Sequence, residues 1–316
     1  MADFLTHILL ADSVIQRIEK RRIMEGVISK RSLYYLGAQG PDPFFFYDIF
    51  NKKGPLKGLG RIMHRQSTGK FLLNGFSALQ NVSYDENWLG LAVYLCGFIC
   101  HFTLDRLLHP YIYWATSEWI WTVDGFFEKS EHSEIEMALD VMLWYEKKGR
   151  RACKQNIRKM IDIGAKWPQS IAALLMDSIE NIYGIEVSIK ELNKVLASYY
   201  RGNDLLYDPV GWKTAIINFF EALTGGGIKP PKKPYPAEYN KNIDWANRKK
   251  RTWKDPFLKG AALNSSVDEI IIEAENIASS HINEIFSRIY RNESIENLFP
   301  DLSYITGQLC TYNSEE

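Results

Sequence analysis

Apolar residues recur every three or four positions along most of this chain, the spacing that gathers them on one face of an α-helix. Nine segments show the pattern: 8–28, 60–80, 86–108, 130–148, 153–165, 168–182, 188–199, 210–222 and 266–290. Convincing alternation of apolar and polar residues, which would indicate strands, is absent from the sequence. Because brief stretches with glycine and proline join the segments, we expect an all-α protein built as a multi-helix bundle.

Composition narrows the class of protein further. The 316 residues are 46% hydrophobic and 24% charged, which supplies a globular core and excludes disordered, collagen-like and coiled-coil chains. Lys plus Arg and Asp plus Glu number 38 each, so the net charge is zero, which disfavours long-range attraction to nucleic acid or an anionic membrane. Four cysteines are too few for a disulfide framework, and we expect buried reduced thiols at Cys96, Cys100, Cys153 and Cys310.

Residues 225–262 differ from the rest, because they combine glycine, proline and positive charge. We interpret them as an exposed loop, and the run Arg248–Arg251 as solvated charge rather than a nucleic-acid patch. The chain is thereby divided into a helical core over 1–224, the loop, and a C-terminal helical segment over 263–316 that packs on the core.

The sequence carries no recognisable targeting or membrane segment. Its start has the acidic Asp3, no basic region and no long apolar run, unlike a secretion signal. The most apolar stretch, Leu89–Cys100, is interrupted by His101 and Asp105 and is too short to span a bilayer. We therefore expect a cytoplasmic protein without a transmembrane helix, and no obligate protein partner is evident.

Histidines and carboxylates at helical spacing are the most informative chemical feature. His101, Asp105 and His109 follow one another at four-residue steps, and each step turns a helix by only about 40°, so all three face one side. His132 and Glu136 repeat the spacing in another segment. A single pair of this kind is commonly a surface hydrogen bond. Within the apolar 86–108 segment, however, burial without a compensating partner would be costly, and a metal ion such as Zn²⁺ supplies that partner.

These residues belong to an ordered series of motifs that resembles the bacterial zinc-dependent phospholipases C, whose fold is shared with single-strand-specific zinc nucleases. The series comprises Phe4-Leu-Thr-His7, Tyr35-Leu-Gly-Ala-Gln-Gly-Pro-Asp42-Pro-Phe44, Arg61-Ile-Met-His64, Gly97-Phe-Ile-Cys-His101-Phe-Thr-Leu-Asp105-Arg-Leu-Leu-His109-Pro110 and His132-Ser-Glu-Ile-Glu136. The resemblance spans residues 7–136, and Asp301–Gly307 is also similar to a family segment. It implies a phospholipase C/zinc nuclease-like bundle with a central multi-zinc site.

The resemblance implies two to three zinc ions and a ligand set for each. One ion would take Asp42, His64, His101 and Asp105, and a second would take His109, His132 and Glu136. A third would share Asp105 and take His7 together with the N-terminal amine and carbonyl. Secreted relatives expose a tryptophan there, whereas removal of Met1 from this chain would leave the amine of Ala2. His281 lies outside the series and is interpreted as an ordinary helix residue.

The implied chemistry is hydrolysis of a phosphodiester, with Asp42 orienting or deprotonating the attacking water. The implied substrate is a glycerophospholipid, cleaved to diacylglycerol and a phosphorylated headgroup, with peripheral membrane contact. The aromatic stretches Phe44–Tyr47 and Tyr111–Trp121 either line a lipid slot, stack a base, or belong to the core.

Two positions bear on headgroup choice, and two other functions stay open. Pro43 and Arg61 stand where choline-preferring relatives carry aromatic residues, so no cation cage is expected there. Arg61 either favours an anionic headgroup or is a surface arginine.

The alternative functions of the protein are a single-strand nuclease or nucleotidase of the same fold, and a non-enzymatic scaffold stabilised by zinc.

Overall fold

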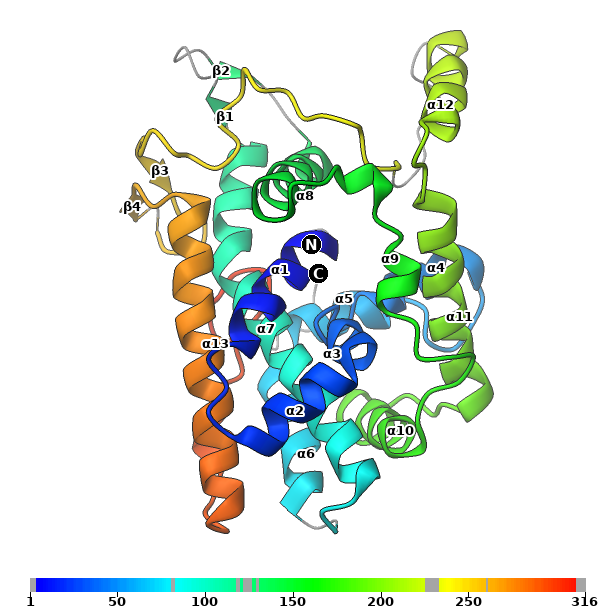
Figure 1. The fold of residues 1–316 in the computed structure, drawn as a ribbon, viewed down its shortest axis with the longest axis vertical. Helices are drawn as coiled ribbons and strands as arrows, with labels where there is room; N and C mark the ends of the chain where they lie inside the picture. Colours follow the sequence, from blue (N-terminus) through cyan, green and yellow to red (C-terminus); the bar gives the residue numbers. More distant parts are fainter. Residues whose placement is uncertain are drawn as a thin grey trace.

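The computed structural model describes residues 4–80, 83–117, 120–121, 127–128, 131–224, 233–259 and 261–310. Over these residues the chain is mostly helical, which confirms the predicted all-α class (Figure 1). The helices are α1 (Phe4–Ile15), α2 (Arg21–Ser29), α3 (Arg31–Gly37), α4 (Pro43–Phe50), α5 (Leu59–Arg65), α6 (Thr68–Gln80), α7 (Glu86–Ser117), α8 (His132–Lys148), α9 (Ile157–Met160), α10 (Gln169–Tyr183), α11 (Ile189–Leu206), α12 (Trp212–Leu223) and α13 (Val267–Tyr290). Two short 3₁₀ helices are η1 (Ala152–Lys154) and η2 (Glu296–Leu298). Strand β1 (Ile120–Trp121) pairs antiparallel with β2 (Phe127–Glu128), and β3 (Trp253–Lys254) with β4 (Ala262–Leu263).

Helix α7 is the core around which the other helices pack. It contacts α1, α2, α3, α6, α8, α10 and α13. By length and composition Glu86–Thr116 could cross a membrane, but 89% of its most apolar window is buried inside the protein, as in a core helix. The helix runs past the predicted end at 108 and through Pro110, because Tyr111 and Ile112 are fully buried and anchor its last turns.

Glycines bring the backbones of α3 and α7 into contact. A Cβ atom on Gly37 would lie 2.1 Å from the carbonyl oxygen of Tyr94, and one on Gly97 would lie 2.2 Å from that of Tyr34. No larger residue fits at either position without moving the backbone. This close approach holds the chain that follows α3 against α7, one turn from His101.

Two predicted segments, 8–28 and 60–80, each form two helices. Between α1 and α2, the backbone of Arg17 and Glu19 is satisfied by Asn283 of α13, whose side-chain amide bonds to both at 2.9 Å. Between α5 and α6, Ser67 adopts a φ of 55°, which ends the helical path. These breaks depend on distant parts of the chain or on one backbone angle, and apolar spacing carries no signal for either.

Other helix boundaries also differ from prediction. The short helices α3 and α4 were not predicted, because seven or eight residues are too few for a clear period. The predicted segment 153–165 contains only η1 and α9. The thiols of Cys96, Cys100 and Cys153 are buried and that of Cys310 is half-buried, all without disulfides.

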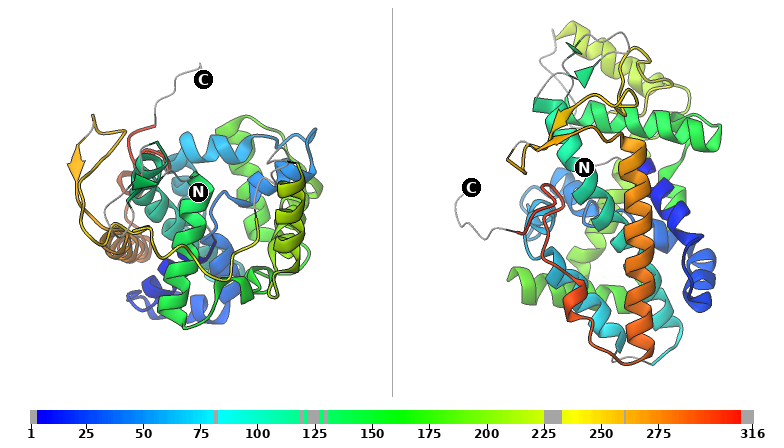
Figure 2. Two further views of the ribbon diagram at one scale, coloured as in Figure 1. Left: turned by 90° about the horizontal axis from the view of Figure 1, so that it is seen from above. Right: turned by 90° about the vertical axis from the view of Figure 1, so that its left-hand side faces the viewer.

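The C-terminal third covers the core. Helix α13 runs along α7 and α1 (Figure 2). The described part of the 225–262 segment is not simply exposed: Trp245 and Trp253 are buried, and Tyr111 donates a hydrogen bond to the carbonyl of Trp245 at 2.9 Å. Arg248 pairs with Glu146 at 2.6 Å and with Asp268 at 2.7 Å. The expectation of an exposed loop is therefore wrong here, because tryptophans tie the segment to α7.

The contact between α3 and α7 predicts a contrast between two glycines of α7. We expect Gly97→Ala to lower the free energy of unfolding by roughly 1–3 kcal/mol, because the added methyl group meets a backbone carbonyl that cannot rotate away. Gly90→Ala is the control, since a Cβ there meets only Leu33 at 3.8 Å, and it should raise stability by up to about 1 kcal/mol. Urea unfolding measures both; equal effects would contradict the prediction.

Candidate metal centre

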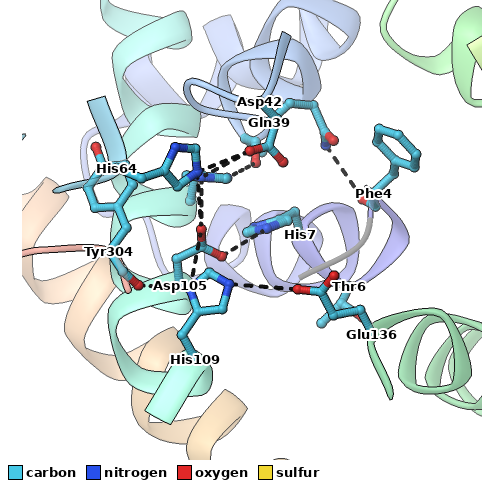
Figure 3. Close-up of polar contacts among 12 residues, drawn as sticks. Phe4, Thr6, His7, Gln39, Asp42, His64, Asp105, His109, Glu136 and Tyr304 are labelled. Carbon is cyan, nitrogen blue, oxygen red and sulfur yellow. Dashed lines mark hydrogen bonds and ion pairs between the residues drawn. The ribbon is translucent and has the colours of Figure 1, made fainter. Parts of the chain in front are cut away.

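The eight predicted ligands come from separate parts of the chain and meet in the interior. His7 lies on α1, Asp42 directly before α4, His64 on α5, His101, Asp105 and His109 on α7, and His132 and Glu136 on α8. All except His132 are buried, and the His132 side chain is 28% exposed. Figure 3 shows His7, Asp42, His64 and Asp105 pointing toward one another. His132 is thus the predicted ligand with the greatest exposure to solvent.

The first group of possible ligands comprises Asp42, His64 and His101. Asp42 Oδ1 lies 3.2 Å from His64 Nε2 and 3.9 Å from His101 Nε2. Asp105 lies beside this group, with its Oδ2 3.2 Å from His101 Nε2 and 3.7 Å from His64 Nε2. A tetrahedron with zinc–ligand bonds of about 2.0–2.1 Å has edges of about 3.3 Å, which the two shortest of these distances match.

Asp105 faces two ways. Its other oxygen, Oδ1, lies 3.2 Å from His7 Nε2, while Oδ2 faces the first group. The His7 ring stacks on that of His101 with centroids 4.3 Å apart, and His7, His101 and Asp105 form a second possible ligand group. A carboxylate in this position can bridge two cations.

The third group lies further along α7, toward α8. His132 Nε2 lies 3.0 Å and His109 Nε2 lies 3.7 Å from Glu136 Oε1. His109 also connects this group to the first, because its Nδ1 lies 3.8 Å from Asp105 Oδ2. Each of the three groups includes at least one residue of α7, so all three adjoin the same helix.

The buried atoms of the first two groups lack hydrogen bonds of acceptable geometry. They are both ring nitrogens of His7, both oxygens of Asp105, Asp42 Oδ1, His64 Nε2 and His101 Nε2. Burial by itself raises the pKa of Asp105, but His101 and His109 outweigh it and hold that pKa well below its usual range. The pKa of Asp42 is likewise raised by burial and lowered more by His101 and His64. Buried ionised carboxylates beside unpaired imidazole nitrogens are the donor set that a zinc ion satisfies.

Backbone carbonyls orient three of the imidazoles. His64 Nδ1 lies 2.6 Å from the carbonyl oxygen of Gly60, His101 Nδ1 lies 3.3 Å from that of Ala38, and His109 Nδ1 lies 2.8 Å from that of Tyr304. A carbonyl only accepts, so Nδ1 carries the proton and the lone pair is left on Nε2. In His64 and His101, Nε2 faces the carboxylates of Asp42 and Asp105, and in His109 Nε2 faces Glu136. Such outer hydrogen bonds fix the tautomer that binds metal.

The C-terminal segment Asp301–Gly307 forms part of this outer layer. The backbone carbonyl of Tyr304 accepts a hydrogen bond from His109. The backbone N–H of Tyr304 donates to the carbonyl of His64 at 2.9 Å. The Tyr304 ring packs on His64 and His101 with centroid distances of 5.3 and 5.6 Å. The sequence indicated only a family likeness here, because the contacts are made by backbone atoms.

Gly40 lets the loop that carries Asp42 lie on His101. It adopts a φ of +51°, and a Cβ atom there would be 2.3 Å from the imidazole Cδ2 of His101. Glycine is therefore required both for the backbone conformation and for the space. This turn places Asp42 within reach of the α7 histidines.

Asp140 is a positioning residue that the sequence analysis did not identify. It is fully buried on α8, one turn after Glu136, and accepts hydrogen bonds from the backbone N–H groups of Leu5 and Thr6 at 2.8 and 2.7 Å. The hydroxyls of Thr6 and Tyr235 also donate to it. A carboxylate there satisfies the free N–H groups at the start of α1 and so holds His7 in place. The four-residue step from Glu136 was the available signal.

The two aromatic stretches contribute mainly to the core. Phe44, Phe46, Tyr47, Tyr111 and Trp114 are buried. The half-buried members face the centre: the Tyr113 ring lies 5.0 Å from that of His132, and the Phe45 ring lies 5.0 Å from that of His64.

The remaining predicted positions are placed as follows. Pro43 is buried at the start of α4 and Arg61 is exposed on α5. His281 packs on Phe299, and burial lowers its pKa to about 4. The amine of Ala2 and the side chains of residues 117–121 lie outside the described residues.

A family model described as zinc dependent phospholipase C matches residues 6–188, more than half of the chain. The chain belongs to the zinc-dependent phospholipase C family. The matched span contains all eight predicted ligands, whereas α11, α12, α13 and the Asp301–Gly307 segment lie beyond it. Searches of curated proteins and of solved structures found no match.

The buried carboxylate on α8 gives a test of how the centre is positioned. We expect Asp140→Asn to lower the free energy of unfolding by roughly 2–4 kcal/mol and to reduce bound zinc, because the amide cannot replace a charged acceptor of several hydrogen bonds. Glu146→Gln is the control on the same helix. It removes an exposed pair with Arg248, so its effect should be within about 1 kcal/mol with zinc unchanged. Equal loss of zinc in both variants would contradict the assignment.

Proposed function

We propose that this family member is a zinc-dependent phosphodiester hydrolase of the phospholipase C type, which cleaves glycerophospholipids to diacylglycerol and a phosphorylated headgroup. The observation that carries the proposal is the cluster of buried nitrogen and oxygen atoms of His7, Asp42, His64, His101 and Asp105 that lack hydrogen bonds of acceptable geometry. Family membership supports zinc as the metal and hydrolysis as the chemistry. Thiolates are absent from the groups, as is typical of hydrolytic rather than structural zinc sites.

The proposed ligand assignment is the one that the family resemblance implies. Asp42, His64, His101 and Asp105 would hold one ion; His109, His132 and Glu136 a second; and His7 with Asp105 a third. His101 also lies close to His7, so these two histidines could exchange roles between neighbouring ions. We propose two to three zinc ions per chain, the third depending on the N-terminal amine.

When bound, clustered zinc ions would polarise the phosphate and lower the pKa of a water molecule, so that hydroxide forms at neutral pH. The protein supplies positioning. Asp42 is the proposed catalytic residue, and its carboxylate, kept ionised by the neighbouring histidines, would accept a hydrogen bond from the attacking water and orient it. A carboxylate with a lowered pKa is better suited to orienting the water than to keeping its proton.

The side chains around the least buried ligand suit an amphiphilic substrate. Tyr113 and Phe45 would give an acyl-glycerol an apolar wall next to the ligands His132 and His64. Arg61 is exposed on the surface, which supports its interpretation as an ordinary surface arginine, and Pro43 offers no ring for a choline cage. We therefore propose a phospholipid substrate without a choline-specific cage at these two positions.

Zinc content tests the site directly. We expect two to three zinc ions per wild-type chain by elemental analysis, and a loss of at least one ion with roughly 100-fold or greater loss of phosphodiesterase activity in His101→Ala. His281→Ala is the control, because this histidine is also largely buried but lies outside the ligand groups. It should keep its zinc. Less than one ion per wild-type chain, not restored by added metal, would favour the scaffold alternative.

A substrate comparison separates the two enzymatic alternatives. We expect the zinc-loaded protein to release diacylglycerol from phospholipid and to cleave single-stranded DNA far more slowly. On uncharged phospholipid, activity should also change little with salt because the net charge is zero, whereas a protein that tracks phosphates loses affinity steeply. Faster cleavage of DNA, with strong salt inhibition, would support the nuclease alternative.

A further inference from the structure

Helix α12 has its apolar face turned away from the protein. Alone among the described α-helices it contains no buried residue. Its apolar residues fall at one-face helical spacing and have exposed fractions of 47–70%: Trp212, Ile216, Phe219, Phe220 and Leu223. In Figure 1 the helix projects at the edge of the molecule, beyond the end of α11. An exposed apolar face of this kind is typical of a site that contacts a protein or a membrane.

Polar contacts near its N-terminus attach α12 to the end of α11. Lys213 Nζ donates to the backbone carbonyls of Asp204, Leu205 and Tyr207 at 2.8–3.1 Å. The backbone N–H and hydroxyl of Thr214 both donate to Asp208, at 2.8 and 2.9 Å. The inner side of α12 is thus bonded to the end of α11, and its apolar side is left facing outward.

A basic segment lies at the base of this helix. Residues 147–159 contain seven Lys and Arg and no acidic residue. Within this segment Arg150, Lys154 and Lys159 are exposed and form no ion pair with another described residue. Cys153, Gln155 and Ile157 of this segment line one small pocket together with Lys233, and Lys233 pairs with Glu221 of α12 at 2.6 Å, so the basic segment lies beside α12. Outward apolar residues flanked by positive charge are typical of helices that lie in the interface of an anionic lipid surface.

We propose that α12 docks the protein on an anionic membrane surface, with its apolar face in the lipid interface and the 147–159 segment on the headgroups. Twelve residues are too few to span a bilayer, so the helix lies in the plane of the surface. This inference rests on the proposed function in one respect: docking by α12 would bring the metal centre to its lipid substrate. Tryptophan and phenylalanine are suited to this interface because their rings are held at headgroup depth.

The fold connects this surface to the metal centre. Helix α11, which leads into α12, packs along α4, the helix that begins directly after Asp42. The packing is close, since a Cβ atom on Gly202 of α11 would meet the ring of Phe46 at 2.1 Å. A membrane bound at α12 would therefore hold the ligand-bearing elements in a fixed position relative to the lipid.

Vesicle sedimentation tests the proposal with the full chain. We expect wild-type protein to bind vesicles of phosphatidylcholine with about one-third phosphatidylserine more tightly than pure phosphatidylcholine, with the difference lost at high salt. Phe219→Gln with Phe220→Gln should weaken binding to both vesicles about tenfold or more per residue. Arg150→Gln with Lys154→Gln should weaken only the salt-sensitive part.

The matched control is Ile28→Gln with Ile272→Gln, two residues on α2 and α13 that are 55% and 53% exposed. This variant should bind vesicles like wild type, and all variants should keep their unfolding midpoint and zinc content. Equal binding by wild type and the Phe219/Phe220 variant would overturn the proposal. A wild-type dimer that the same variant dissociates would also overturn it, because a second copy would then cover α12. Binding is scored without turnover, so it can fail while lipid hydrolysis is found, or hold while hydrolysis is absent.

Discussion

The structure depends on the burial of charged carboxylates inside an apolar helix. Asp105 lies without exposure at the middle of α7, the helix on which the rest of the bundle packs. An isolated charge there would cost several kcal/mol, and the surrounding imidazoles only partly replace water, since both of its oxygens lack good hydrogen bonds. A divalent cation would remove this penalty, and folding of the core would then be coupled to binding of the metal.

The same requirement explains why so much of the chain surrounds the centre. Carbonyls of Gly60, Ala38 and Tyr304 turn three imidazoles, and they come from three separate segments. Gly40 and the backbone contact of α3 with α7 bring in Asp42, while Asp140 holds the start of α1. Each of these contacts restrains one ligand. Together they give a preorganised site, which is what clustered-metal hydrolysis needs.

The part of the chain that matches the family model and the part beyond it contain different features. The matched span 6–188 holds every candidate ligand and accounts for the chemistry. The parts beyond it do other work: the 301–307 segment completes the outer layer of the centre, and α12 presents an apolar face to the outside. The candidate metal centre and the outward apolar helix thus belong to different segments of the chain.

The sequence by itself determined what is local. Steps of four residues placed His101, Asp105 and His109 on one face, and apolar spacing predicted the helices, because both depend only on the turn of the helix. The order of motifs identified the family. The tertiary structure decided how distant segments join: the break at Arg17–Glu19 that Asn283 satisfies, the capping of α1 by Asp140, and the backbone contacts of Tyr304. It also decided the direction of α12, since periodicity shows that a helix has an apolar face, whereas only packing determines whether that face points inward or outward.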